Sequence, residues 1–395
     1  MVQWISLGDI NKYLFFPFVG GMVTLLFNLI IKKIDKEFIK HPLIRGVNSG
    51  MGMSLSIIPF LIIKIRTKSL NKEISKNLLV LENKKKEEKN KLIKGKYILL
   101  LICSFLDFLQ KSLSFIIIHD SENNVWIFDL IFFTFFSWFL LNEKFYKHQY
   151  LSLLIMVIIV TITFILDFSH IKENIGDFFL VLYIELVYSI NHVLNKYLME
   201  NKFCSPYEIS FYEGIFCLII NIILLSIFSH IEIPKHSGIF KVFSTKNYNG
   251  KFFIDNFKSY TDSFDTKEFF AFLLSAINKV SYNLFSLLTI KHFSPSHVII
   301  ILFFGEIEYF IVTMKRGNYI FTIFIFILLI FSILVFTEII ELNFLGLSDN
   351  TKKNIRERAI KEENQRGSSF NDKDIELEDG MILNLAINEN EEKEK

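Results

Sequence analysis

Charged side chains lie inside long apolar stretches of this sequence, where they could bind a charged ligand or carry a proton. Asp107 and Lys111 share one stretch, and Lys279 lies in another. An ionisable group at membrane depth costs about 2.5–3.5 kcal/mol on insertion scales, so it normally faces a bundle interior or a wet cavity. The substrate or coupling candidates are Asp107, Lys111, Glu185, His192, Asn278, Lys279, Tyr282, Asn283 and Glu306.

Asp107 and Lys111 are four residues apart, so they share one face of a helix and could neutralise each other. One interpretation is a structural ion pair that fixes the register of its helix. The other is a gated pair, in which Asp107 exchanges Lys111 for a proton or for the amine of a substrate. A buried ion pair is not by itself evidence of function, so both interpretations stay open.

Lys279 has no carboxylate three or four residues away in the sequence. Its partner must therefore come from another helix or from a ligand, and Asp107, Glu185 and Glu306 are the candidate carboxylates. Because an unpaired cation inside a membrane is costly, a functional role for Lys279 is favoured. We expect Lys279 and at least one of these carboxylates to line one central cavity.

The other acidic residues carry different expectations. Glu185 is central in its apolar run and suits either an interhelical hydrogen bond or a proton site. Glu306 and Glu308 point to different faces, and Glu306 is nearer the middle of its run. Asp129 is expected near a helix end, where a local hydrogen bond suffices. Cavity hydrogen bonds or simple polar packing are the two interpretations of Asn191, His192, Tyr282 and Asn283.

Catalysis is not expected from this sequence. It contains no nucleophile–base arrangement, no glycine-rich phosphate loop and no cluster with metal-ligand spacing, so no enzyme activity, cofactor or metal is predicted. Cys103, Cys204 and Cys217 are read as small apolar residues. The charges crowd into loops and the C-terminal tail, and no nucleic-acid-binding surface emerges.

The apolar runs that carry these residues predict an all-α, polytopic membrane protein. Apolar residues make up 51% of the chain, more than soluble domains usually have. A helix that crosses a hydrocarbon core of roughly 30 Å needs about twenty apolar residues. Ten transmembrane helices are predicted, at about 14–31, 43–63, 97–118, 125–141, 149–167, 176–198, 207–228, 269–290, 297–314 and 318–340.

Ten spans divide into two halves of five, 1–167 and 168–341. Five is odd, so the second half enters the membrane in the opposite sense, which is the inverted repeat of many secondary transporters. A basic loop at 64–96 favours the cytoplasmic side and predicts that both termini are cytoplasmic. The charged tail, 342–395, is expected to be disordered.

The second predicted span carries a stripe of small residues that would let another helix approach closely. The stripe consists of Gly46, Ser49, Gly50, Gly52 and Ser54.

Five short motifs occur in a fixed order across the chain: Phe38 to Pro42, Cys103 to Asp107, Leu141 to Lys144 with His148 and Gln149, Tyr212 to Gly214, and Tyr282-Asn283 with Lys291 and Ser294. Together they resemble the drug/metabolite transporter superfamily, and more closely the F6-like branch of solute carrier 35, whose members are ten-helix EamA-like transporters. The resemblance implies structural roles for His41, Pro42, Glu143, Lys144, Glu213 and Gly214.

The resemblance implies a secondary active transporter that moves a small organic solute by alternating access. It would lie in an endomembrane, either lysosomal or vacuolar or of the Golgi, with the lipid bilayer as its surroundings. Proton coupling and a homodimer are left open. A nucleotide-sugar antiporter that uses Lys279 to bind phosphate is the first alternative. A membrane scaffold that does not transport is an alternative of another class.

Overall fold

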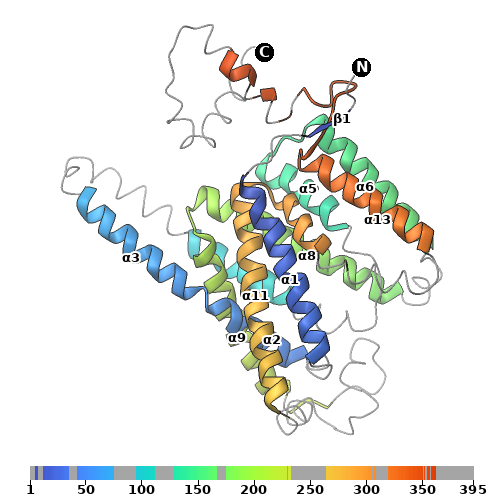
Figure 1. Cartoon of the computed structure of the whole chain (residues 1–395). Coiled ribbons are helices and arrows are strands. Elements are labelled where there is room, and N and C mark those ends of the chain that lie inside the picture. Colours follow the sequence, from blue (N-terminus) through green and yellow to red (C-terminus); the bar gives the residue numbers. More distant parts are fainter. Residues whose placement is uncertain are drawn as a thin grey trace. The chain divides into compact units, whose positions relative to one another are not determined.

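The structure is a computed structural model that describes residues 5–7, 12–34, 42–74, 95–111, 128–166, 175–228, 230–232, 264–304, 307, 319–349, 351, 354–355 and 357–361. Most of these residues are helical (Figure 1). The named elements are β1 (Ile5–Leu7), η1 (Lys12–Leu14), α1 (Phe15–Ile34), α2 (Pro42–Ser54), α3 (Ile57–Ile74), α5 (Phe128–Leu141), α6 (Lys147–Leu166), α8 (Ile175–Asn201), α9 (Pro206–Phe228), α11 (Thr266–His292), η5 (Pro295–Val298), α13 (Tyr319–Phe336) and β2 (Ile340–Leu342).

The prediction of a largely helical chain is confirmed. Predicted spans 14–31, 176–198, 207–228 and 269–290 agree with α1, α8, α9 and α11 to within about one helical turn. Span 97–118 is helical over 95–111, and its remainder lies outside the described residues. Span 297–314 begins with η5 and stays helical to 304. The count of ten spans and their inverted repeat stay predictions.

The predicted second span, 43–63, is two helices rather than one. α2 ends at Ser54 and α3 begins at Ile57. Pro59 has no backbone N–H and its ring clashes with the carbonyl four residues earlier, that of Leu55, so a continuous helix is disfavoured there. The chain instead turns at Leu55 and Ser56, whose N–H groups donate to Gly52 O and Met53 O at 3.0 Å. α3 then continues to Ile74, into the predicted loop 64–96.

Contacts divide the chain into two compact units. The larger unit comprises Lys12–Glu143 and Met156–Ile327, and the smaller unit comprises Met1–Asn11, Lys144–Ile155 and Leu328–Lys395. These units are defined by contacts between residues, whereas the predicted division at residue 167 separates two five-helix repeats related by symmetry. The inverted repeat is therefore not tested by this division.

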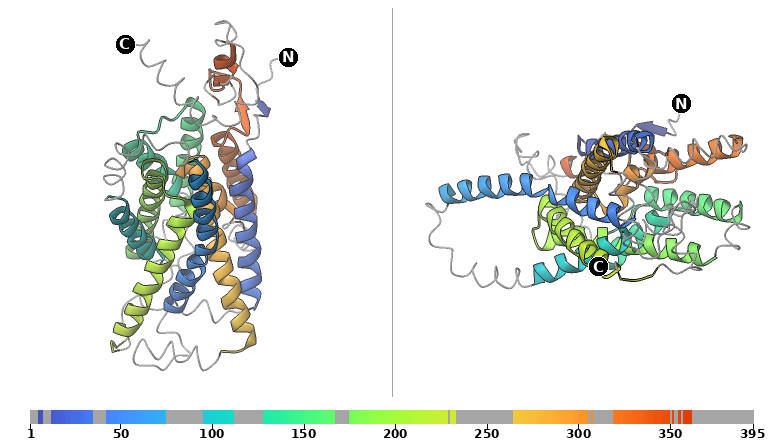
Figure 2. Two further views of the ribbon diagram at one scale, coloured as in Figure 1. Left: turned by 90° about the vertical axis from the view of Figure 1, so that its left-hand side faces the viewer. Right: turned by 90° about the horizontal axis from the view of Figure 1, so that it is seen from below.

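In the larger unit, α2 packs against both α9 and α11, and α1 packs along α11 (Figures 1 and 2). The close approach that the small residues predicted is confirmed. A Cβ on Gly50 would lie 2.6 Å from the backbone nitrogen of Leu218, and one on Gly52 would overlap the carbonyl oxygen of Ala276. Gly214 makes the reciprocal approach from α9, since its Cβ would lie 2.5 Å from the backbone nitrogen of Ser54. Small residues thus bring three helices into backbone contact.

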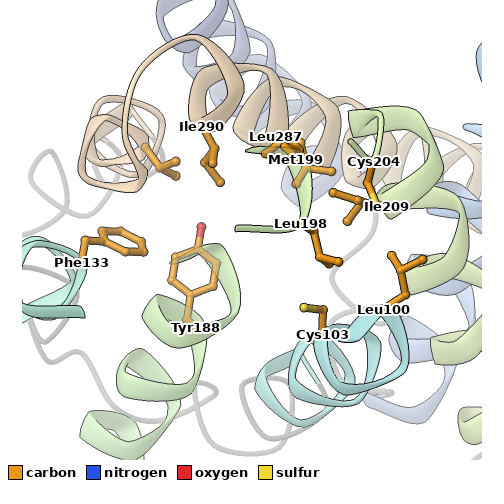
Figure 3. Packing of buried hydrophobic residues seen from close by; sticks show 11 residues of the cluster. Leu100, Cys103, Phe133, Tyr188, Leu198, Met199, Cys204, Ile209, Leu287 and Ile290 are labelled. Carbon is orange, nitrogen blue, oxygen red and sulfur yellow. The ribbon is translucent and has the colours of Figure 1, made fainter. Parts of the chain in front are cut away.

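A second group of helices in the same unit surrounds a buried hydrophobic cluster. α5 packs on α8, and both contact η5, which also contacts α11. Phe133, Tyr188, Leu287 and Ile290 are members of the cluster, and Figure 3 shows the Phe133 and Tyr188 rings next to each other. This group positions the aromatic residues described below.

α9 has the polarity expected of a helix that faces lipid. Ser210, Glu213, Cys217 and Asn221 are buried along one face, whereas isoleucines on the other faces are exposed, Ile219 by 51%. A water-soluble helix shows the opposite arrangement. Among the described residues, four helical segments are long and apolar enough to cross a membrane, consistent with a membrane protein: Ile44–Arg66, Phe178–Asn201, Pro206–Ile227 and Thr266–His292.

The smaller unit joins the start of the chain to the region after α13. β1 pairs with β2 in an antiparallel arrangement, with Ser6 opposite Glu341. Ser152 Oγ donates to the carbonyl oxygen of Ser332 at 2.7 Å, and Ser332 Oγ donates to that of Ser152 at 2.9 Å. These bonds tie the start of α6 to α13.

The boundaries predicted for span 318–340 and for the tail, 342–395, need correction. α13 ends at Phe336, and Glu338 follows with a left-handed backbone, φ 61°. Leu342 and Leu347 are then buried in a cluster with residues of α6 and α13, because these apolar side chains interrupt the charged sequence. Residues 362–395 lie outside the described residues.

Candidate functional site

A buried carboxyl group on α9 is held by amides from two other helices. Asn195 Nδ2 donates to Glu213 Oε1 at 2.9 Å, and Asn191 Nδ2 lies 3.4 Å from the same oxygen. Asn283 Nδ2 donates to Oε2 at 3.0 Å and to Ser210 Oγ at 3.1 Å. We call these five residues the Glu213 node. Since it joins α8, α9 and α11, the node fixes how these helices are rotated against one another.

The predicted pair of Asp107 and Lys111 forms. Lys111 Nζ lies 2.7 Å from both carboxylate oxygens, and the two side chains are about nine-tenths buried. Lys111 Nζ also lies 2.8 Å from Met53 Sδ, which places the pair against α2. Both residues interact electrostatically with Glu213, so the pair and the node form one charged region.

Lys279 belongs to the surroundings of this pair. It interacts electrostatically with Asp107, one of its predicted partners, and also with Lys111 and with Arg45 of α2. The Lys279 and Arg45 side chains are half-buried, whereas Glu213 is fully buried. The region therefore has a closed side at the node and a partly open side at the two cations.

Four aromatic side chains from three helices form a separate group. The Tyr188 ring lies 4.2 Å from the ring of His192 and 5.7 Å from that of Phe133, measured between centroids. The rings of Phe133 and His192 are 5.6 Å apart, so the three rings contact one another pairwise. The Tyr188 hydroxyl bonds to the Tyr282 hydroxyl of α11 at 2.5 Å. We call Phe133, Tyr188, His192 and Tyr282 the aromatic patch.

Two carboxyl groups adjoin the aromatic patch. The carboxyl of Glu185 on α8 interacts with that of Asp129 on α5, and both interact electrostatically with Tyr188. Asp129 lies in the first turn of α5, near a helix end as expected, but it is only 1% exposed because α5 packs against α8. Glu185 is half-buried and gives this pair an open side.

Helical spacing explains which residues enter each group. Asp129, Phe133 and Ser137 are four residues apart on α5, so all three lie on its buried face. On α8, Glu185, Tyr188 and His192 follow each other by three and four residues and share a face. The neighbours Tyr282 and Asn283 of α11 point in different directions, the first to the aromatic patch and the second to the Glu213 node.

The remaining predicted residues have other positions. Asn278 Nδ2 donates to Asn28 Oδ1 of α1 at 2.8 Å. Pro42 is the first residue of α2. Glu143 and Lys144 follow α5, and the N–H of Glu143 donates to Ser137 O at 3.2 Å, a bond that caps the end of α5. His41 and Glu306 lie outside the described residues.

Several residues of these groups, Phe133 among them, were not predicted from the sequence. Asn195 and Ser210 complete the Glu213 node, and Tyr188 is the centre of the aromatic patch. Arg45 is an ionisable residue inside a predicted span, a signal that could have identified it as it identified Lys279. Asp129 was considered but not selected.

The cysteines do not gather with other metal-binding side chains. Within the described ranges, no group of three or more His, Cys, Asp or Glu residues could hold a metal ion. Cys204, in the loop between α8 and α9, lies near the ion pair of Lys96 and Glu208, whose atoms are 2.8 Å apart. Burial raises the pKa of the Cys204 thiol to about 11, against the opposing effect of Lys96, so the neutral thiol predominates at pH 7.

No family model matches the chain, and no curated protein sequence is significantly similar to it.

Proposed function

We propose that this protein is a secondary active transporter of a small organic solute, with ten transmembrane helices in two inverted five-helix repeats. It would work by alternating access across an endomembrane, as the resemblance to the drug/metabolite transporter superfamily implies. The observation that carries the proposal is the placement of charged and amide side chains inside apolar helices whose outer faces are exposed isoleucines. Such residues mark ligand or ion pathways in membrane proteins.

Two motifs of the resemblance support the proposal because they meet in space. Asn283, from the pair Tyr282-Asn283, donates to Glu213, from the segment Tyr212 to Gly214, across 70 residues of sequence. Gly214 of the same motif lets α9 approach α2. In this proposal the Glu213 node keeps α8, α9 and α11 together as one moving group, while the half-buried Lys279 and Glu185 face the transport pathway.

A nucleotide-sugar antiporter remains the second candidate, and one observation favours it. Lys279 interacts electrostatically with Arg45 and with Lys111. Three cations so placed would attract a phosphate group. Asp107 and Glu213 offset two of these charges, which leaves a smaller attraction for an anion. We therefore rank this candidate below an organic solute without phosphate.

The test is uptake by proteoliposomes that contain the purified full chain. The panel holds organic cations, neutral metabolites and nucleotide sugars, each measured with and without a pH gradient. We expect saturable uptake of one class, and uptake of nucleotide sugars alone would select the second candidate. If monodisperse, reconstituted protein takes up none of these solutes, the transport proposal fails in favour of a membrane scaffold.

Lys279→Ala provides a residue-level check of the same proposal. We expect uptake to fall at least tenfold with little change in protein abundance, because Lys279 is half-buried beside the Asp107–Lys111 pair and its charge influences the pathway. Lys267→Ala, at the exposed start of the same helix, is the matched control and should retain uptake. Equal activities of the two variants would remove Lys279 from the pathway.

A further inference from the structure

The aromatic patch combines ring faces that would suit a positive charge, and Phe133, Tyr188 and His192 are all buried in the present structure. Its rings from α5 and α8 contact pairwise at centroid distances of 4.2–5.7 Å, and Figure 3 shows Phe133 and Tyr188 next to each other. The faces of aromatic rings attract cations through their quadrupole, and sites for quaternary ammonium groups are built from such rings. Packed aromatic rings are also found in ordinary hydrophobic cores, so a second observation is needed to infer a binding site.

The two carboxyl groups beside the rings also favour the binding of a cation at the aromatic patch. Asp129 and Glu185 interact directly across the α5–α8 contact. Two carboxyls in contact cannot both ionise cheaply, so they share a proton or take up a cation. Glu185 and Tyr282 are half-buried, whereas Asp129 is buried, so a ligand would reach the pair from the Glu185 and Tyr282 side.

Unmatched polar atoms on the same faces provide a third and independent observation. His192 is 4% exposed, and within the described part of the chain neither of its ring nitrogens has a side-chain hydrogen-bond partner. The hydroxyls of Ser137, Ser189 and Ser286 are likewise buried without a partner there. Buried polar groups are normally hydrogen-bonded, and a group of exceptions indicates a place where a ligand or water completes the bonding.

We propose that the aromatic patch, with Glu185 and Asp129, is the binding site for an organic cation, meaning a protonated amine or quaternary ammonium compound that carries an apolar ring. The positive charge lies at the two carboxyls, and the apolar part stacks on Phe133 and Tyr188. The bond between the Tyr188 and Tyr282 hydroxyls closes the site in the present state and opens when the ligand enters. This inference rests on the proposed transport function and names its substrate class.

The region of Lys279 is less suited to this ligand. It gathers Arg45, Lys111 and Lys279 against Asp107 and Glu213, so it is not acidic. A metal ion is also a poorer occupant of the aromatic patch, because ring faces and hydroxyls surround the two carboxyls. Charge and ring geometry therefore agree on an organic cation.

The binding test compares two fluorescent molecules that differ by one methyl group. The cation is 4-(4-dimethylaminostyryl)-N-methylpyridinium, and the neutral analogue is the corresponding pyridine, which is uncharged at pH 8. With the purified full chain in detergent, we expect saturable binding of the cation at least tenfold tighter than that of the neutral analogue. Tetrapropylammonium should compete, and a nucleotide sugar should not.

Variants then locate the site. Glu185→Gln and Phe133→Leu should each weaken cation binding at least tenfold, the first by removing charge and the second by removing a ring. Glu208→Gln is the matched control, since Glu208 pairs with Lys96 away from the aromatic patch, and it should bind as the unmodified chain does. Equal affinity for the two fluorescent molecules would overturn the inference, as would unchanged binding in a monodisperse Glu185→Gln variant.

Uptake measurements separate this inference from the transport proposal. If the cation binds but no solute is taken up by proteoliposomes, the site stands and the transport proposal fails. If another solute is taken up and the cation does not bind, the transport proposal stands and the substrate class named here is wrong.

Discussion

The larger unit contains two acidic sites whose carboxyl groups have different partners. At the Glu213 node, three amide groups point their N–H donors at one carboxyl. At the aromatic patch, the Glu185 carboxyl interacts with another carboxyl, that of Asp129. The first arrangement satisfies a buried carboxyl with hydrogen bonds, whereas the second gains from the arrival of a positive charge. Acidic residues of one bundle thus hold helices together at the Glu213 node, whereas at the aromatic patch they favour the binding of a positive charge.

The two sites are neighbours because adjacent residues contribute to each. Asn191 and His192 follow one another on α8 but turn to different sites, as do Tyr282 and Asn283 on α11. Consecutive residues of a helix are about 100° apart, so one helix can present both surfaces. A motion that opens the aromatic patch can therefore leave the Glu213 node intact, and stability and binding should respond to different substitutions.

The largest effect is expected from breaking the ion pair beside the Glu213 node. Lys111→Met removes the cation that contacts both oxygens of the buried Asp107 and leaves that carboxylate without it. Breaking one side of a buried pair costs about 3–5 kcal/mol. We expect a large fall in the midpoint of thermal unfolding, measured on detergent-purified protein by loss of the monodisperse peak.

The double variant Asp107→Asn/Lys111→Met is the control for this prediction. Replacing both charges removes the stranded carboxylate, so most of the lost stability should return. If the double variant is as unstable as Lys111→Met, the pair does not explain the loss. If Lys111→Met is as stable as the unmodified chain, the pair is not structural and its gated interpretation gains support.

Removing the acceptor of the Glu213 node should have the next largest effect. Glu213→Leu leaves the donors of Asn191, Asn195 and Asn283 without their shared acceptor. Each lost hydrogen bond is worth about 1 kcal/mol, so the free energy of unfolding should fall by about 3 kcal/mol. The same thermal assay, supported by urea unfolding, measures the change.

Two isosteric substitutions test whether the two acidic sites differ in their contribution to stability. Glu213→Gln keeps one acceptor oxygen, so it should lose less stability than Glu213→Leu. Glu185→Gln at the other acidic site should change stability by under about 1 kcal/mol, because it removes a charge that faces another carboxyl. Equal losses in Glu213→Gln and Glu185→Gln would contradict the distinction between the two sites.

The sequence carried the information for the local parts of this arrangement. Asp107 and Lys111 were paired from their spacing, since i and i+4 always share a helical face. The small residues of α2 predicted close helix packing, because only small side chains permit backbone contact. The apolar runs located α1, α8, α9 and α11, whereas the break before Pro59 was missed because composition alone does not register a lost N–H group.

The partners across helices could not be predicted. Whether Asn191 or His192 faces Glu213 depends on the rotation of α8 about its axis, which tertiary packing sets. The two residues are equally polar and adjacent, so no periodicity separates them. Asp129 shows the same limit, since its burial comes from the contact of α5 with α8 rather than from its own sequence.

A substitution at Gly52 tests whether α2 and α11 are held together by close backbone contact. A Cβ added at Gly52 would overlap the carbonyl oxygen of Ala276, a backbone atom that cannot rotate away. We expect Gly52→Ala to destabilise the protein by about 1–3 kcal/mol, the usual cost of overpacking. Gly95→Ala is the control, since its Cβ would meet only the end of the Lys202 side chain at 3.5 Å. An unchanged unfolding midpoint in Gly52→Ala would show that α2 and α11 can separate freely.

The smallest effect is expected at the aromatic patch, and its sign is reversed. His192→Phe replaces a buried imidazole, whose ring nitrogens have no side-chain hydrogen-bond partner among the described residues, with a ring of similar size. An unsatisfied buried polar group costs about 1–3 kcal/mol. The variant should therefore be more stable than the unmodified chain by about 1 kcal/mol in the absence of ligand, as a higher midpoint of thermal unfolding would show.

His148→Phe is the comparison, because His148 is 2% exposed and its ring nitrogens also make no hydrogen bond among the described residues, but its Nε2 lies 3.3 Å from Glu338 Oε1, within ion-pair distance. Losing this partner should destabilise the smaller unit, so the two histidine substitutions should change stability in opposite directions. Destabilisation by His192→Phe would mean that the imidazole is matched in the resting protein. The aromatic patch would then stabilise the fold as the Glu213 node does, and the distinction between a structural site and a binding site would be wrong.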